Sequence, residues 1–339
     1  MSDLHVIALG GTIAAAQAAT TDAGGVLPSA TAAEITAAAG LDSLPGGGPE
    51  VSFDQVAQVG SPSITFQMLD AVLASARQAR ADGARAVIVT QGTDTLEDTA
   101  FILALMNDTG LPIAVTGAMR NPTLPGADGP ANVRAAALAA LDPRLAGLPS
   151  VLVFADEVHS PLTVTKAHTT SVAAFTSPGA GPLGWVSEDR VVLAHMPATL
   201  PGTLTVPDAA DASAAETPRV ALVAAGFDDD LAYLSGLADA GYAGAVIAGV
   251  GGGHVSDRAI ESVAALAEQL PVVLASRTGA GAVLERTYAY PGAEIDLLSR
   301  GLISAGVLNA CRARLLLMLA LRAGVPRESL PGVFAAFRG

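Results

Sequence analysis

The chain has 339 residues and a formal charge of −14, the difference between 18 basic and 32 acidic side chains. Such an acidic surface argues against nucleic acids and anionic membranes as partners, and no run of about twenty apolar residues could cross a bilayer. The first residues lead directly into an apolar segment without the basic stretch of a signal peptide. We therefore expect a cytoplasmic protein.

The first part of the chain alternates between short apolar runs and segments with helical periodicity. Strands are predicted at Leu4–Leu9, Val51–Ala57, Ala86–Thr90, Ile113–Thr116 and Val151–Phe154. Helices are predicted at Thr65–Ala81, Leu96–Asn107 and Pro130–Leu141. Apolar strands that alternate with helices are typical of a parallel sheet covered on both faces. We therefore predict a flavodoxin- or Rossmann-like N-terminal domain.

A second series of strands and helices follows a passage rich in proline and alanine, Pro197 to Pro218, which we interpret as a linker region. The strands are predicted at Val220–Ala224, Ala245–Ala248 and Val272–Ala275, and the helices at Asp230–Ala240, Asp257–Gln269 and Leu308–Ala323. The chain is long enough for two domains. We predict an α/β protein with a larger N-terminal domain at residues 1–205, a linker at 206–216 and a smaller C-terminal domain at 217–339.

Lysine and cysteine each occur once. Lys166 lies in the hydroxyl-rich segment Leu162-Thr163-Val164-Thr165-Lys166-Ala167-His168-Thr169-Thr170. A buried lysine amine can lose its proton and act as a base, whereas an arginine guanidinium stays charged. Lys166 is therefore a candidate catalytic base. Cys311 lies in the apolar run Val307 to Leu321, where we expect a small buried side chain, and a single cysteine excludes an internal disulfide.

Four glycine-containing loops follow predicted strands, and the first three are rich in hydroxyl groups. Ligands of an open parallel sheet bind beyond the carboxyl ends of the strands, where such loops lie. Thr95 and Asp98 fit a helix capping box, which leaves Thr93 and Asp94 available for a function. Gly10-Gly11 lacks the third glycine of a dinucleotide-binding loop. The loops are Gly10-Gly11-Thr12-Ile13-Ala14, Gly60-Ser61-Pro62-Ser63, Gln91-Gly92-Thr93-Asp94-Thr95 and Gly117-Ala118-Met119-Arg120.

These residue types point to acyl transfer or hydrolysis. A threonine hydroxyl that a nearby amine activates can act as a nucleophile, and backbone N–H groups at helix starts can stabilise an oxyanion. The histidines are scattered, at His5, His159, His168, His195 and His254, and the sequence has no His/Cys cluster. We therefore expect no metal site and no cofactor.

The motifs occur in the same order in the bacterial-type L-asparaginases, which this chain resembles along nearly its whole length. The first signature stands here as Gly10-Gly11-Thr12-Ile13-Ala14, and the second as Gly92-Thr93-Asp94-Thr95-Leu96-Glu97-Asp98-Thr99. Further matching segments are Thr116-Gly117-Ala118-Met119-Arg120, Ala127-Asp128-Gly129-Pro130-Ala131-Asn132, Thr165-Lys166 with Thr169-Thr170, Gly181-Pro182-Leu183-Gly184, Ser276-Arg277 and Ala313-Arg314-Leu315-Leu316-Leu317.

The resemblance implies a catalytic role for four residues. Thr12 would attack the side-chain amide carbonyl of L-asparagine and form an acyl ester as ammonia leaves. Thr93, Asp94 and Lys166 would handle protons and activate the hydrolytic water. Which of the two threonines attacks first stays open, and so does the assignment of the base.

The resemblance also implies how the substrate is held. Asp94, beside Thr93, would bind the α-ammonium group by opposite charge. Ser61 and the backbone of its loop at Gly60 would receive the α-carboxylate. The backbone carbonyl of Ala118 would accept a hydrogen bond from the scissile amide nitrogen.

Two segments depart from the family pattern. Family members commonly carry a tyrosine in the loop Ala14 to Pro28, where it orients the nucleophilic threonine, and this loop contains none. The loop Gly249-Val250-Gly251-Gly252-Gly253-His254 ends in His254, where better known members have an asparagine that reaches a neighbouring subunit's site. The candidates to replace the tyrosine are Thr20, Thr21, Asp22, Tyr288 and Tyr290.

The resemblance therefore implies a homotetrameric hydrolase that acts on L-asparagine and more weakly on L-glutamine. A glutaminase-leaning or D-isomer-tolerant amidase of the same fold is one alternative. A non-catalytic or very weak amino-acid-binding member is another, and the missing loop tyrosine favours it. The intact set of Thr12, Thr93, Asp94 and Lys166 favours the hydrolase.

Overall fold

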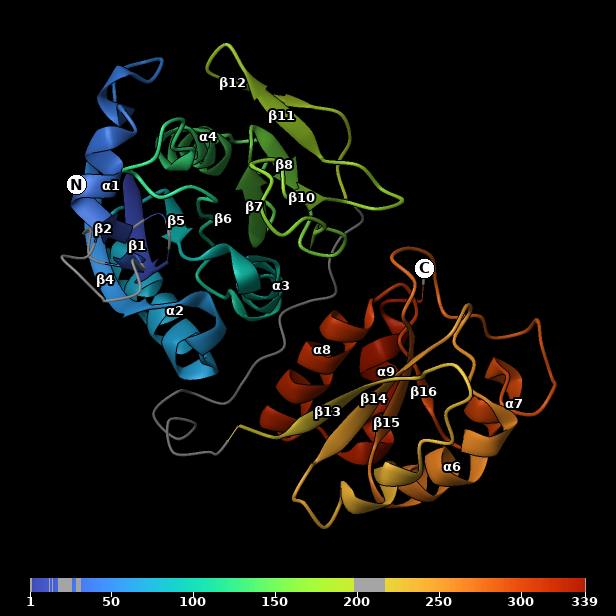
Figure 1. Ribbon diagram of the computed structural model, residues 1–339. Helices are drawn as coiled ribbons and strands as arrows, with labels where there is room; N and C mark the ends of the chain where they lie inside the picture. Colours follow the sequence, from blue (N-terminus) through green and yellow to red (C-terminus); the bar gives the residue numbers. More distant parts are fainter. Residues whose placement is uncertain are drawn as a thin grey trace. The chain divides into compact units, whose positions relative to one another are not determined.

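The structure is a computed structural model that describes residues 2–11, 13, 15–17, 26–28, 32–197 and 217–338. It divides into two compact units, Met1–Thr203 and Leu204–Gly339, and each contains its own sheet covered by helices (Figure 1). The predicted α/β organisation in two domains is therefore confirmed. The domain boundaries at 205 and 217 stay a prediction, because the segment between them lies outside the described residues.

The N-terminal unit is built on a mixed sheet with the strand order β12-β11-β8-β7-β6-β5-β1-β4. The run from β4 to β7 is parallel, as predicted. The run from β7 to β12 is antiparallel, and it was not predicted because strands of three or four residues offer too few positions for a periodicity. The strands are β1 Leu4–Gly10, β4 Val51–Val59, β5 Ala86–Thr90, β6 Ile113–Thr116, β7 Ser150–Phe154, β8 Glu157–His159, β11 Gly184–Ser187 and β12 Arg190–Leu193.

Helices cover both faces of this sheet (Figure 1). On one face, α2 (Phe66–Ala81) contacts β1 and β4, and α3 (Leu96–Met106) contacts β6 and β7. On the other face, α1 (Ala32–Ala38) contacts β1 and β4, and α4 (Gly129–Leu141) contacts β5, β6 and β7. Alanines of α4 form much of the core on that face. Their small side chains let the helix approach the apolar strands closely.

The C-terminal unit has a parallel sheet in the order β13-β14-β15-β16, with α8 against β13 to β15 and α9 against β16. The strands and helices are β13 Val220–Ala224, β14 Gly244–Gly249, β15 Val272–Ser276, β16 Ile303–Ser304, α6 Ile260–Gln269, α7 Glu294–Ser299, α8 Ala310–Arg322 and α9 Leu330–Ala335.

Two expectations for this unit are wrong. The helix predicted at Asp230–Ala240 is only a 3₁₀ turn, η5 (Ala232–Gly236), because Leu231 adopts a left-handed conformation with φ 50° at its start. Cys311 is exposed and not buried. It stands in the first turn of α8, whose buried face instead carries residues such as Ala313 and Leu316.

No helix within the described ranges is both long and apolar enough to span a bilayer.

Candidate active site

Glycine main chains hold three loops together at the carboxyl edge of the N-terminal sheet. Gly11 follows β1 with φ +84°, and a Cβ built on it would lie 2.0 Å from the backbone nitrogen of Gly92. A Cβ on Gly117 would lie 2.5 Å from the carbonyl oxygen of Gln91. Both distances are shorter than any real contact, so side chains are excluded where the loops after β1, β5 and β6 meet.

Lys166 reaches this edge from a short ribbon, in which β9 (Thr165–Lys166) pairs with β10 (Phe175–Thr176). Its Nζ donates to Thr93 Oγ1 at 2.9 Å and to Asp94 Oδ1 at 2.6 Å. Thr93 is buried and the lysine side chain is 15% exposed, whereas the Asp94 side chain is 64% exposed. The structure therefore brings together three of the four predicted catalytic residues, with the carboxylate turned toward solvent.

Ser61 fixes the turn that carries Asp94. Ser61 begins the turn η3 (Ser61–Ser63) and is buried. Its Oγ accepts the backbone N–H of Asp94 at 3.1 Å, and its carbonyl accepts the hydroxyl of Thr95 at 2.8 Å. Thr95 makes no side-chain capping bond at the start of α3, so the predicted capping box is wrong. The hydroxyl instead joins the loop after β5 to the loop after β4.

The loop around Ala118 is braced by two residues to which no role was given from the sequence. Asp128 accepts the backbone N–H groups of Met119 at 2.9 Å and Arg120 at 2.8 Å. Asn132 donates from Nδ2 to the carbonyl of Gly117 at 2.9 Å. Ala118, which lies between Gly117 and Met119, is buried. These hydrogen bonds hold the backbone on both sides of it. The matching segment from Ala127 to Asn132 was the signal available in the sequence.

Thr12 lies outside the described residues, and so do Thr20, Thr21 and Asp22 of the loop that follows it. The ends of that loop form a short antiparallel pair, β2 (Ala15–Gln17) with β3 (Val26–Pro28). No geometry is therefore assigned to the predicted nucleophile, although the preceding Gly11 lies against Gly92.

His254, Tyr290 and Glu294 form a hydrogen-bonded chain within the C-terminal unit. Tyr290 Oη lies 2.8 Å from His254 Nδ1, and His254 Nε2 lies 3.0 Å from Glu294 Oε2. Burial by itself would raise the pKa of Glu294, but backbone N–H groups of Tyr288 and Thr287, together with His254, lower it overall. The hydroxyl of Tyr290, one candidate for the missing loop tyrosine, is thus bonded to His254.

The remaining histidines and the acidic residues give no indication of a metal. Within the described parts of the chain, no group of three or more His, Cys, Asp or Glu side chains could hold an ion. His5 bonds Ser52 and Ser75, and His159 bonds Ser177. Both are packed side chains that bond serine hydroxyls.

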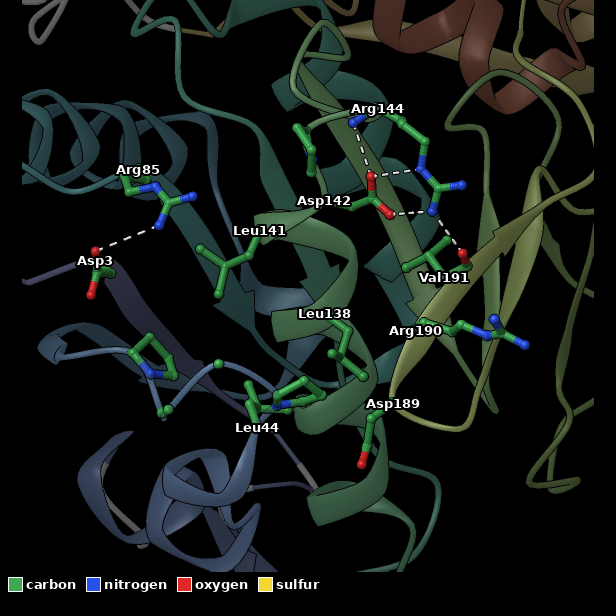
Figure 2. Close-up of a pocket in the computed structure, with 16 residues that line it drawn as sticks. Asp3, Leu44, Arg85, Leu138, Leu141, Asp142, Arg144, Asp189, Arg190 and Val191 are labelled. Atoms are coloured by element: carbon green, nitrogen blue, oxygen red, sulfur yellow. Dashed lines mark hydrogen bonds and ion pairs between the residues drawn. The ribbon is translucent and has the colours of Figure 1, made fainter.

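A groove of about 630 Å³ lies at the opposite, amino-terminal edge of the sheet (Figure 2). None of the predicted site residues lines it. Its rim is charged, but each guanidinium has a carboxylate nearby, so neither sign of charge prevails. The pairs are Arg144 with Asp142 at 2.6 Å, Arg85 with Asp3 at 3.7 Å and Arg190 with Glu188 at 3.5 Å.

The chain is thus a two-domain α/β protein. Its first domain carries a hydroxyl, an amine and a carboxylate at the carboxyl edge of the sheet. Residues 3–199 match the family model described as asparaginase, N-terminal, and residues 219–334 match the glutaminase/asparaginase C-terminal domain. The chain belongs to the asparaginase family.

Individual relatives cover nearly the whole chain. A Deinococcus radiodurans protein named "Probable L-asparaginase" is 36% identical over 86% of this chain and 88% of its own length. "L-asparaginase 2" of Escherichia coli is 31% identical over 98% of this chain and 93% of its own length. "Glutaminase-asparaginase" of Pseudomonas fluorescens is 30% identical over 98% of this chain and 90% of its own length.

A solved structure has the same fold. The crystal structure of a "Probable Cytoplasmic L-asparaginase" from Campylobacter jejuni matches with a TM-score of 0.82 and 27% identity, and the match covers 99% of both chains.

Proposed function

We propose that this protein is an L-asparaginase, which hydrolyses the side-chain amide of L-asparagine to L-aspartate and ammonia, with weaker action on L-glutamine. The observation that carries the proposal is the cluster of Thr93, Asp94 and Lys166 in a chain of the asparaginase family. Relatives named L-asparaginase support the main substrate. A relative named glutaminase-asparaginase supports the secondary one.

The reaction has two stages. In the first, the hydroxyl of Thr12 adds to the amide carbon, the C–N bond breaks, and the amide nitrogen leaves as ammonia with the hydroxyl proton. In the second, water attacks the acyl ester and restores the threonine. We assign proton transfer to Lys166 acting through Thr93, because Nζ is hydrogen-bonded to that hydroxyl.

Substrate binding uses the groups around this cluster. Asp94, whose side chain is mainly exposed, attracts the α-ammonium group. The loop of Gly60 and Ser61 receives the α-carboxylate through its backbone. The carbonyl of Ala118, which Asp128 and Asn132 brace on both sides, accepts from the scissile nitrogen. No cofactor has a part in these steps.

Ammonia release from L-asparagine tests the proposal, with EDTA present throughout because no metal has a role. We expect turnover of L-asparagine, slower turnover of L-glutamine and loss of both in the Thr12→Ala variant. The absent loop tyrosine also favours a protein that only binds amino acids. Saturable binding of L-asparagine without ammonia release would establish that alternative and overturn the hydrolase.

The assembly and the compartment are proposed with the same activity. We propose a homotetramer and a cytoplasmic location. One similar protein is described as cytoplasmic and another as periplasmic, so fractionation of the source cells is the direct test of location.

A further inference from the structure

The amine of Lys166 is presented by a very short element. β9 and β10 have two residues each and form a sheet of their own, separate from the eight-stranded sheet of the same unit. Their register is Phe175↔Lys166 and Thr176↔Thr165. An isolated two-stranded ribbon is marginal in water, yet a proton-transfer group must be held to within about 0.5 Å. Phe175 on β10 packs on Phe154 of β7, with ring centroids 4.8 Å apart, so a further contact is needed on β9 to fix Lys166 itself.

Glu97 supplies that contact. Its Oε2 accepts the backbone N–H of Lys166 at 2.6 Å, in a part-buried position. A hydrogen bond of this length to a carboxylate is of the strong, charge-assisted kind. Glu97 belongs to the first turn of α3, so it ties the ribbon to a buried helix of the main fold.

The position of Glu97 along the chain gives this contact its precision. Thr93 and Asp94 lie in the turn η4 (Thr93–Thr95) that runs directly into α3. Residues three apart in such a turn lie on the same side, which places Glu97 beside Asp94. One turn of chain thus holds Lys166 twice, at its backbone N–H through Glu97 and at Nζ through Thr93 and Asp94. The length of the lysine side chain sets the distance between these two points, the backbone N–H and Nζ.

We propose that Glu97 is a positioning residue of the asparaginase reaction, acting through the main chain of Lys166. The proposal rests on the proposed function. Glu97 would not bind substrate, because its carboxylate is directed at the lysine backbone. It would instead set the place from which the amine exchanges a proton with Thr93.

Three substitutions of Glu97 distinguish the effect of where its acceptor oxygen lies from the effect of its negative charge. Glu97→Ala removes the acceptor, Glu97→Gln keeps an acceptor oxygen at the same reach without the charge, and Glu97→Asp keeps the charge on a side chain one methylene shorter. A displacement of about 1 Å can cost on the order of a hundredfold in rate. We expect kcat to fall by about that factor in the Ala and Asp variants and to recover to within about fivefold in the Gln variant.

The effect should fall on kcat and not on KM. The Asp94 carboxylate is bonded to Nζ, but the turn that carries it is held by Ser61, so we expect KM to change by less than about threefold, far less than kcat. Asp108→Ala is the matched control, since it removes a carboxylate that pairs with Arg77 on the same unit and should leave kcat unchanged. A Glu97→Ala variant with kcat within threefold of the parent would overturn the proposal. So would a Gln variant as slow as the Ala variant.

A second readout does not depend on activity. Lys166 is the only lysine, so the N-terminus is the only other amine that acetic anhydride can label. Peptide mass analysis should show faster labelling of Lys166 in Glu97→Ala than in the parent and in Asp108→Ala. If the parent releases no ammonia but the labelling rates differ as stated, the proposed function fails and the positioning contact stands. Equal labelling rates in all three proteins would refute the contact itself.

Discussion

Lys166 donates from Nζ to Thr93 Oγ1 and Asp94 Oδ1 at the same time, while most of its side chain is buried. An arginine in its place could still form an ion pair with Asp94, but it could not take up and release a proton at the hydroxyl. The proposed proton transfer therefore depends on the amine and not only on the positive charge.

The first prediction follows from that difference. Lys166→Arg should lower kcat for L-asparagine by on the order of a hundredfold to ten-thousandfold, the usual contribution of a general base. Steady-state ammonia release measures the effect. Arg190→Lys, at an exposed position on β12, is the matched control and should have no effect. Activity of Lys166→Arg within a few-fold of the parent would remove this residue from the mechanism.

His159 governs a different property, the dependence of stability on pH. It is fully buried on β8, and burial lowers its pKa from 6.5 to about 4. Glu157 Oε2 lies 3.3 Å from Nε2, but Nε2 has no hydrogen-bond partner, so burial outweighs this neighbour. In the folded protein His159 therefore stays neutral down to about pH 4, whereas the unfolded chain binds a proton below about pH 6.5.

This buried histidine should destabilise the protein as the pH falls from 6.5 to 4, by up to about 1.4 kcal/mol per pH unit. Above pH 6.5 its contribution is constant. Urea unfolding at pH 7, 6 and 5, followed by the fluorescence of the single tryptophan, Trp185 on β11, measures the slope. His159→Asn can still bond Ser177 and should show a smaller slope. Identical slopes in the two proteins would show that other groups control the acid sensitivity.

At the scale of the elements, the candidate site depends on how closely the loops after the strands approach one another. Gly11 has both a left-handed conformation and no room for a Cβ beside Gly92. The hydroxyls and carboxylates of the site are placed by this approach, because Ser61 bonds the turn of Asp94 and Asn132 bonds Gly117. A displaced loop should therefore affect several catalytic groups at once.

Gly11→Ala tests this dependence. The added Cβ would overlap the backbone of Gly92, so we expect loss of activity by on the order of a hundredfold or more, with destabilisation above about 1 kcal/mol. Ammonia release and thermal unfolding measure the two effects. Gly147→Ala is the control, because a Cβ there meets nothing within 4 Å. Unchanged activity in Gly11→Ala would mean that the loops can separate without cost to the site.

The elements also differ in how well the sequence predicted them. The parallel strands other than β16 and the helices α2, α3, α4, α6 and α8 were predicted at or near their observed bounds, because buried apolar segments carry a strong periodicity. The strands β8, β11, β12 and β16 were missed because each has four residues or fewer. The helix at Asp230–Ala240 was wrong because a left-handed Leu231 limits it to a short turn. That backbone choice has no periodic signature in the sequence.

At the scale of the whole molecule, several large apolar side chains remain exposed in the single chain. Phe227 is 99% exposed, Tyr233 is 59% exposed and Trp185 is 44% exposed. Exposed aromatic side chains of this kind often mark interfaces between proteins. They support the proposed homotetramer, which a net charge of −14 would otherwise oppose by repulsion between copies.

We therefore predict a mass of four times the 33.7 kDa of one chain by light scattering at micromolar concentration. Phe227→Asp adds a charge at the most exposed aromatic position and should shift the distribution toward smaller species. A monomer that retains full activity would contradict the prediction. A stable tetramer in Phe227→Asp would show that the interface lies elsewhere.

The sequence by itself determined the order of the α/β elements, the division into two domains and the motifs from which the family was suspected. These properties follow from local patterns, namely the apolar periodicity of each segment and the residue types that follow each strand. The choice of Thr93, Asp94 and Lys166 as candidates also came from composition and motif. Their proximity did not, because Lys166 and Thr93 are 73 residues apart.

Only the tertiary structure decided how the groups of the site are held. In that structure Ser61 accepts the backbone N–H of Asp94, 33 residues away, and Glu97 accepts the backbone N–H of Lys166, 69 residues away. Contacts over such separations depend on how the sheet, α3 and the β9–β10 ribbon pack together. A local pattern carries no information on that packing, because the same residues at the same spacing could point elsewhere on another arrangement of strands.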